Sequence, residues 1–252
     1  MKVVETEFEG VFEISILPKV DDRGFFVRTY DKDIFHTNKI NYNWVQENKS
    51  FSKQSGTIRG MHFQFSPYTE TKLISVSKGK ILDVILDLRN NSKTFGKCFS
   101  TIISEENSKS LLVPRGFAHG FCTLEDDTKV CYKVDNYYMP KSEGGIIWND
   151  SSLKIDWPVD NPIISEKDSK LITFKEFLKR LSLVYKKKTI KCQLYSLKCF
   201  YNSLNTSVLC CLINHSAESG LSCLFDKGTY FLIFFSLLEI STSISLILKG
   251  LF

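Results

Sequence analysis

Short runs of alternating apolar and polar residues, separated by Gly, Asn, Asp and Pro, extend from Phe12 to about Trp148. Successive side chains of a β-strand point to opposite faces of its sheet, so this alternation is typical of strands with one buried face. Several short strands divided by turn residues predict an antiparallel β-sandwich or barrel. The expected fold class is therefore all-β.

The segment from Lys72 to Arg89 shows this pattern best, and Gly79 divides it into two predicted strands. In the second strand one face carries Leu82, Val84, Leu86 and Leu88, and the other carries Ile81, Asp83, Ile85 and Asp87. The first face predicts a core. The second mixes aliphatic and carboxylate side chains, which suits either the lining of a polar cavity or a solvated surface.

The hydrophobic period changes beyond Trp157-Pro158. Apolar residues then recur at helical spacing, at Leu171, Phe174, Leu178 and Leu181, with Ile172 and Phe177 beside them. The segment from Ser165 to Ser169 supplies candidate capping residues ahead of them. We therefore expect a short C-terminal helix that closes the core.

Composition places a domain boundary near Lys186. All six prolines and all three tryptophans precede residue 163, whereas residues 186–252 are rich in Leu, Ser, Phe and Cys. We predict one domain at residues 1–185 and an extension of unknown structure at 186–252. Within the extension, Thr229 to Leu248 is long enough to span a bilayer but contains Glu239 and six Ser or Thr residues. A membrane anchor is not the favoured interpretation; a segment packed on the domain and an extension without stable structure stay open.

Charge and cysteine content narrow the function classes. The extension carries four of the five net positive charges, which leaves residues 1–185 nearly neutral and without a basic stripe, so no nucleic-acid partner is expected. The eight cysteines show neither paired metal-ligand spacing nor a secreted-domain framework. Acidic residues stand near the start, where a signal peptide needs an apolar run. These features predict a cytoplasmic protein with reduced thiols.

Candidate chemistry begins at His62, in the predicted strand from Thr57 to Gln64. A single histidine in a strand is more often a structural residue than a catalyst, but Gly60 permits a bulge or a close backbone approach. Strict alternation would place Arg59 and His62 on opposite faces. The two can reach one ligand only if the strand bulges at Gly60 or one of them acts across a subunit boundary.

A metal site is the main rival interpretation for histidines in such a barrel. Metal-holding cupins usually carry His-x-His with a nearby Glu on one strand, yet the positions two residues either side of His62 are Gly60 and Gln64. His62 and His119 alone make a poor set of metal ligands. We expect no metal and no cofactor, and we treat His36 and His215 as incidental.

A set of ordered motifs runs along the chain: Asp22-Arg23-Gly24-Phe25-Phe26, Gln46-Glu47-Asn48, Ile58-Arg59-Gly60-Met61-His62-Phe63-Gln64, Lys72-Leu73, Gly116-Phe117-Ala118-His119-Gly120-Phe121, Tyr137-Tyr138 and Trp148-Asn149-Asp150. In the order and spacing of these motifs, the chain from about Lys2 to Asp168 resembles the dTDP-4-dehydrorhamnose 3,5-epimerase family. The resemblance implies a cupin-like jelly roll and a homodimer in which N-terminal strands of one subunit pair with the other. It also implies cofactor-independent epimerisation of a dTDP-linked 4-keto-6-deoxy sugar, in synthesis of rhamnose-type precursors for surface polysaccharide.

The chemistry of such a reaction requires three kinds of group. A ketone at carbon 4 acidifies the hydrogens on carbons 3 and 5, because the carbanion delocalises onto oxygen. Inversion needs a base on one face of the sugar and an acid on the other, and a cation stabilises the oxyanion. By resemblance His62 is the base, Tyr132 the acid and Lys72 the cation. Asp168 corresponds to the carboxylate that orients the histidine, although it could simply be an acid at a helix N-terminus.

The resemblance also implies a set of substrate-binding residues. Nucleotide and diphosphate contacts correspond to Arg23, Gln46, Glu47, Asn48 and Arg59, and other ligand contacts to His119, Glu143 and Lys167. Tyr138 corresponds to the aromatic ring that stacks on the pyrimidine base, although Tyr137 and Tyr138 could instead pack a sheet edge. One departure stands out, since Arg28 occupies a position where the family commonly has Glu. If this position faces the nucleotide, base or sugar preference changes.

Three functions therefore stay open. The first is 3,5-epimerisation of a dTDP-4-keto-6-deoxyhexose. The second is inversion of a single carbon, or isomerisation of another nucleotide ketosugar, on the same barrel. The third is a non-catalytic cupin that binds sugar nucleotides or mediates assembly; the joint presence of His62, Lys72, Tyr132 and Asp168 argues against it, because binding alone requires neither a base nor an acid.

Overall fold

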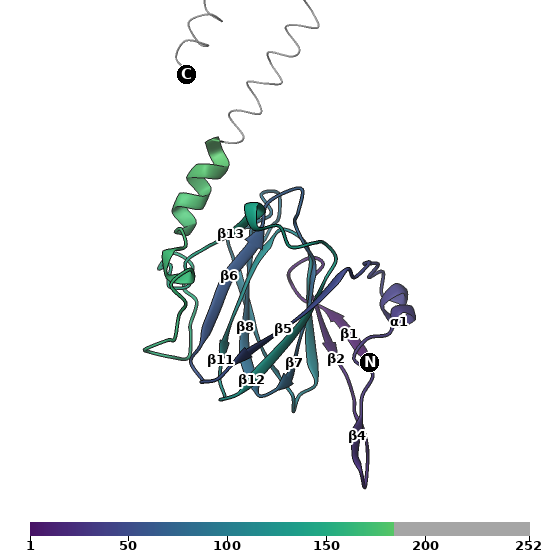
Figure 1. Cartoon of the computed structure of the whole chain (residues 1–252). Coiled ribbons are helices and arrows are strands. Elements are labelled where there is room, and N and C mark those ends of the chain that lie inside the picture. Colours follow the sequence, from purple (N-terminus) through teal and green to yellow (C-terminus); the bar gives the residue numbers. More distant parts are fainter. Residues whose placement is uncertain (184–252) are drawn as a thin grey trace, which may run out of the picture. The chain divides into compact units, whose positions relative to one another are not determined.

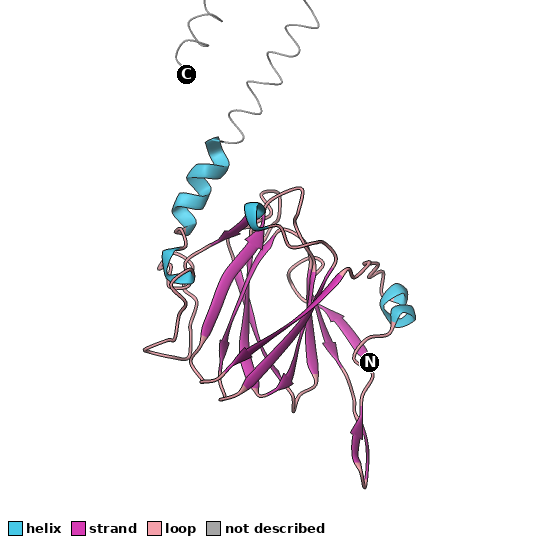
Figure 2. Cartoon of the chain, viewed as in Figure 1, coloured by secondary structure: helices cyan, strands magenta, loops and turns pink. Residues whose placement is uncertain are grey.

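The computed structural model describes residues 1–183, which form strands and short helices (Figures 1 and 2). The strands are β1 (Lys2–Glu5), β2 (Phe12–Ser15), β3 (Lys19–Asp21), β4 (Gly24–Phe26), β5 (Gln46–Ser52), β6 (Ile58–Gln64), β7 (Lys72–Lys78), β8 (Lys80–Asp87), β9 (Cys98–Ser104), β10 (Lys109–Val113), β11 (Phe117–Thr123), β12 (Thr128–Val134) and β13 (Glu143–Gly145). The helical elements are α1 (Lys32–Thr37), the 3₁₀ turns η1 (Pro140–Ser142) and η2 (Asp168–Lys170), and a helix at residues 174–183.

Two antiparallel sheets face each other. One has the strand order β1-β2-β10-β7-β12-β5 and the other the order β13-β6-β11-β8-β9, while β3 and β4 form a separate hairpin. Gly79 separates β7 from β8, as predicted, but the two strands belong to different sheets, so the chain crosses the sandwich there. The predicted all-β, cupin-like jelly roll is confirmed.

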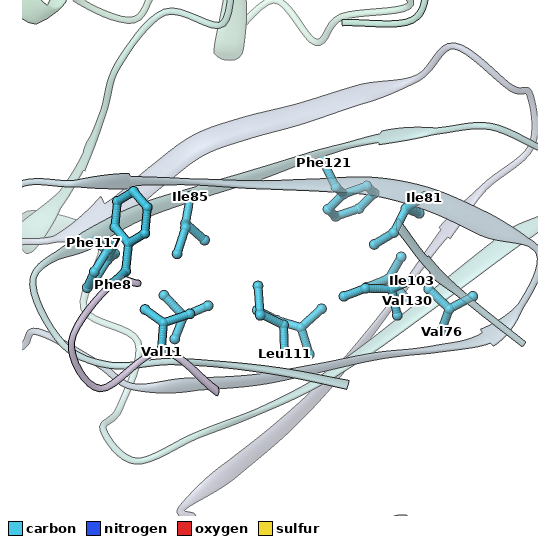
Figure 3. Packing of buried hydrophobic residues seen from close by; sticks show 12 residues of the cluster. Phe8, Val11, Val76, Ile81, Ile85, Ile103, Leu111, Phe117, Phe121 and Val130 are labelled. Atoms are coloured by element: carbon cyan, nitrogen blue, oxygen red, sulfur yellow. The ribbon is translucent and has the colours of Figure 1, made fainter. Parts of the chain in front are cut away.

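The main core fills the space between the sheets (Figure 3). Ile81 and Ile85 of β8 contribute to it from one sheet, and Ile74 and Leu111 from the other. The mixed face of β8 therefore points into the sandwich, and its carboxylates Asp83 and Asp87 are fully buried. The mixed face of β8 is therefore not a solvated surface, which was one of its two interpretations.

The opposite face of β8 is also covered. Val84 and Leu86 are fully buried in a second cluster, which Phe177 joins from the helix at residues 174–183. The predicted helix is confirmed from residue 174 onward. Leu171 and Ile172, which the helical spacing included, precede it, and Ile172 forms an isolated β-bridge with Ile146. The predicted cap is wrong. Thr173 and Glu176 form a capping box, with Thr173 Oγ1 accepting from Glu176 N at 3.2 Å and Glu176 Oε2 accepting from Thr173 N at 2.8 Å. Ser165 instead lies ahead of the turn η2, where its Oγ accepts from Asp168 N at 3.0 Å.

The hairpin of β3 and β4 extends away from the two sheets (Figure 1). It carries apolar side chains that are largely exposed within this chain, with Val20 at 79%, Phe25 at 59% and Phe26 at 66%. The following helix α1 begins at its N-cap Asp31, whose carboxylate accepts from Asp33 N and Ile34 N. Single exposed apolar residues are ordinary, but three on one short hairpin mark a surface suited to another polypeptide.

Several predictions fall outside the described residues. The boundary near Lys186 and the apolar segment from Thr229 to Leu248 both lie beyond residue 183 and stay predictions. Within residues 1–183 no helix is long and apolar enough to cross a membrane. The three cysteines of this part of the chain are free, and burial raises the pKa of the Cys98 and Cys122 thiols to about 11.

Candidate active site

A bulge between β6 and β11 shapes the candidate site. The register of the two strands shifts between His119 and Phe121, opposite Gly60, which has φ +126°. A Cβ on Gly60 would lie 2.5 Å from Gly120 Cα, so the backbones touch more closely than any side chain allows. The bulge interrupts strict alternation, and both Arg59 and His62 consequently line one cleft. Of the two ways in which they could share a ligand, the chain uses the bulge.

The cleft has a volume of about 500 Å³, within the range of small-molecule sites. All four proposed catalytic side chains line it, from four separate elements: His62 of β6, Lys72 of β7, Tyr132 of β12 and Asp168 of η2. Three of the proposed binding residues join them, namely Arg59, His119 and Lys167. Folding therefore gathers seven polar side chains that lie far apart in the sequence.

His62 and Asp168 form a close contact in the cleft. His62 Nε2 lies 2.8 Å from Asp168 Oδ1, and Asp168 Oδ2 accepts from Gly60 N at 3.1 Å. Burial opposes ionisation of Asp168, but these bonds and the bond to Ser165 outweigh it and hold its pKa below the ordinary range. The ionised carboxylate fixes the proton on Nε2 and leaves Nδ1 as the basic nitrogen of the ring. The side chain of Asp168 is thus directed at His62 and does more than start a helical turn.

Tyr132 and Lys72 occupy neighbouring strands of the other sheet. Burial, followed by the charge of Glu70, raises the pKa of the Tyr132 phenol, so the hydroxyl keeps its proton throughout the neutral range. Lys72 Nζ lies 3.3 Å from Glu70 Oε1. An un-ionised phenol and an ammonium are the forms needed to return a proton and to stabilise an oxyanion.

Five of the other proposed binding residues are connected to residues that line the cleft. Asn48 of β5 stands opposite Tyr132 in the β-ladder, and the neighbouring Glu47 pairs with Lys133 at 2.7 Å. A chain of bonds joins the remaining ones: Gln46 Oε1 accepts from Tyr138 N at 2.9 Å, the Tyr138 hydroxyl donates to Glu143 at 2.8 Å, and Lys167 pairs with Glu143 at 2.6 Å. Tyr138 is 53% exposed, so its ring is not packed into a sheet edge.

The hairpin residue Arg23 is not brought to the cleft. Its side chain is 89% exposed and pairs with Asp21 at 2.6 Å. Arg28, the departure from the family pattern, pairs with Asp31 at 2.9 Å and is 66% exposed. Within one chain, neither arginine contacts the residues that line the cleft.

Two acidic residues at the site were not identified from the sequence. Asp83 is fully buried and its Oδ2 lies 2.8 Å from His119 Nε2, so a second imidazole and carboxylate pair stands in the cleft wall. The alternation of β8 predicted that Asp83 lies on the mixed face, but it did not predict which side chain Asp83 contacts. Glu70, the partner of Lys72, lies in a loop and follows no periodic pattern.

Metal ligands do not gather in the described part of the chain. Among residues 1–183 no three His, Cys, Asp or Glu side chains are grouped as a metal ion requires. That neither a metal nor a cofactor takes part stays a prediction.

A cupin-like jelly roll with an imidazole, a phenol and an ammonium around one cleft defines an isomerase that moves protons beside a carbonyl. Comparison with known proteins is specific. Residues 5–176 match the family model described as dTDP-4-dehydrorhamnose 3,5-epimerase, and the chain belongs to this family.

Individual relatives agree with this assignment. The dTDP-4-dehydrorhamnose 3,5-epimerase of Shigella flexneri is 42% identical over 173 residues, which cover 67% of this chain and 93% of the relative. A crystal structure of the Bacillus anthracis enzyme with TDP and PPi bound is 48% identical, with a TM-score of 0.68 and coverage of 69% of this chain and 99% of that one. The Legionella pneumophila enzyme in complex with dTDP-4-keto-L-rhamnose is 36% identical, with a TM-score of 0.65, and the match covers 68% and 92% of the two chains.

Proposed function

We propose that this protein inverts carbons 3 and 5 of a dTDP-4-keto-6-deoxyhexose in the cytoplasm, as a step in the synthesis of dTDP-L-rhamnose-type precursors for polysaccharide. The observation that carries the proposal is the cleft itself. His62, Tyr132 and Lys72 line one cavity of about 500 Å³, and the carboxylate of Asp168 lies 2.8 Å from the imidazole of His62 and fixes its orientation. Family membership supplies the substrate class.

In the proposed mechanism His62 removes the proton from a carbon next to the ketone. Asp168 stabilises the imidazolium that results, because its carboxylate is ionised and 2.8 Å away. The electrons move onto the carbon 4 oxygen as an enolate, and the ammonium of Lys72 neutralises the charge. Tyr132 then returns a proton to the opposite face of the same carbon. Proton exchange with solvent restores the neutral imidazole and the un-ionised phenol, and the same steps follow at the second carbon.

The charged residues around the cleft would hold the rest of the substrate. Arg59 lines the cleft and is fixed by its own bonds, from Nε to Ser52 Oγ at 3.2 Å and from Nη2 to Phe51 O at 3.0 Å. Arg59 and Lys167 suit a diphosphate, since guanidinium and ammonium groups are the usual phosphate ligands. The exposed ring of Tyr138 is available to stack on the pyrimidine base.

Exchange with solvent deuterium tests the function. In D₂O the wild-type protein is expected to place deuterium on both carbons of the dTDP ketosugar, as read by NMR. Deuterium at one carbon only would favour the single-carbon alternative. Binding of the ketosugar without exchange at either carbon would contradict the proposal and leave the non-catalytic alternative.

Replacing Tyr132 with Phe is expected to separate the two halves of the reaction. The variant loses the acid but keeps His62, so proton abstraction continues while inversion falls by about 100-fold or more. Some exchange at the original configuration should therefore persist, and NMR of the recovered substrate in D₂O measures it. Complete loss of exchange in a folded variant would assign Tyr132 another role.

We further propose that the protein is a homodimer in which the β3–β4 hairpin lies against the second copy. The exposed Phe25 and Phe26 then become buried, and Arg23 of the same hairpin is carried toward the partner's cleft. Replacing both phenylalanines with Ser is expected to give a monomer by light scattering and to raise KM about 10-fold or more. Ile102→Ser, at another exposed apolar position, is the control. An unchanged dimer in the double variant would contradict the hairpin's role.

A further inference from the structure

Glu70 contacts Lys72 but is not itself among the residues that line the catalytic cleft. It lies in the loop before β7 and lines a second, largely apolar cavity of about 260 Å³, which shares Lys72 and His119 with the catalytic cleft. The Lys72 side chain therefore belongs to the wall between two cavities. Its ion pair with Glu70 is well shielded, because the two side chains are only 12% and 13% exposed.

The position of Glu70 is itself fixed. Glu70 Oε2 accepts from Gln64 Nε2 at 3.0 Å, while Oε1 faces the ammonium of Lys72. Gln64 is buried two residues beyond His62 on β6, and its Oε1 accepts from Met139 N at 2.6 Å. A rigid strand thus orients the carboxylate that contacts Lys72.

A shielded lysine needs such a partner. Its ammonium is costly to desolvate, and its four-carbon stem leaves it several rotamers. A cation that stabilises an enolate acts best when it is in place before charge develops.

We propose that Glu70 is a positioning residue for the reaction described above: its carboxylate holds the Lys72 ammonium in the wall of the cleft, ready for the enolate oxygen. The inference rests on the proposed function only for its kinetic consequence. The ion pair and its fixation by Gln64 are properties of the protein without substrate.

The variant Glu70→Gln tests the inference with little change of shape. The amide oxygen can still accept from Gln64, so the loop stays in place while the charge beside Lys72 is lost. We expect kcat for deuterium exchange to fall about 10-fold and KM to change less than about twofold. In a Lys72→Met background the same substitution should have no further effect, because there is no ammonium left to position. Glu106→Gln, which removes an 82% exposed carboxylate beside Lys80, is the matched control.

A second measurement separates this inference from the function itself. Labelling of the Lys72 amine by an acetylating reagent, read by mass spectrometry, is expected to be about threefold or more faster in Glu70→Gln than in wild type, since the ion pair no longer restrains it. Equal labelling rates would overturn the inference, and so would additive losses in the Lys72→Met background. If the wild-type protein exchanges no deuterium, the proposed function fails, and the labelling rates alone decide the role of Glu70.

Discussion

Replacement of His62 with Ala is expected to lower kcat for epimerisation by about 1,000-fold, the usual contribution of a general base. Deuterium exchange should fall equally at carbons 3 and 5, because the same imidazole removes both protons in the proposed mechanism. Asp168 cannot substitute, since its carboxylate is buried and bonded to Gly60 N. Exchange monitored by NMR in D₂O, with dTDP binding by calorimetry, measures both the loss and the intactness of the site.

The matched control is His36→Ala, which removes an exposed histidine of α1. It should exchange deuterium at the wild-type rate. If His62→Ala kept exchange at one carbon near the wild-type rate, a second base would have to act there. That result would refute the assignment of both protons to His62.

Replacement of Gly60 with Ala is expected to damage both stability and activity. The new Cβ would lie 2.5 Å from Gly120 Cα and 2.8 Å from His119 O, so β6 and β11 must separate. We expect a loss of about 3 kcal/mol or more in the free energy of unfolding. Because Arg59 and His62 flank this position, a displacement of about 1 Å should also lower kcat about 100-fold. Denaturant unfolding and deuterium exchange measure the two effects.

Gly10→Ala supplies a control for the backbone conformation. Gly10 also has a positive φ, +79°, but a Cβ there would lie 3.4 Å from Pro114 Cγ, which is an ordinary contact distance. In this variant the free energy of unfolding should fall by only about 1 kcal/mol, which is the cost of placing Ala in the left-handed conformation. Equal losses of stability in the two variants would show that contact with β11 is unimportant.

The sequence predicted the strands and the helix well where a pattern was local. Alternation placed β7 and β8 on either side of Gly79, and helical spacing predicted the helix that contributes Phe177 to the core. The cap of that helix was misplaced because Ser165 to Ser169 offered several hydroxyls and acids, whereas the capping box of Thr173 and Glu176 depends on where the chain turns. Propensity suggests caps but cannot choose among neighbouring ones.

The motifs named most residues that line the cleft, but they did not predict which of these side chains contact one another. Family resemblance named His62, Tyr132, Lys72 and Asp168, whereas Glu70 and Asp83 carry no motif and were missed. A loop carboxylate and an alternating strand residue show their function only through the side chains they meet. These side-chain contacts depend on which strands become neighbours in the sheets.

The sequence by itself determined the all-β class, the strand faces and the residue types needed for proton transfer, because periodicity and chemistry are properties of neighbouring residues. Only the tertiary structure decided that Arg59 and His62 share a cleft, since the bulge exists through contact of Gly60 with Gly120 on another strand. It also decided that Asp168 orients His62, across 106 positions of the chain. Contacts between distant segments follow from the packing of whole sheets, which no local pattern encodes.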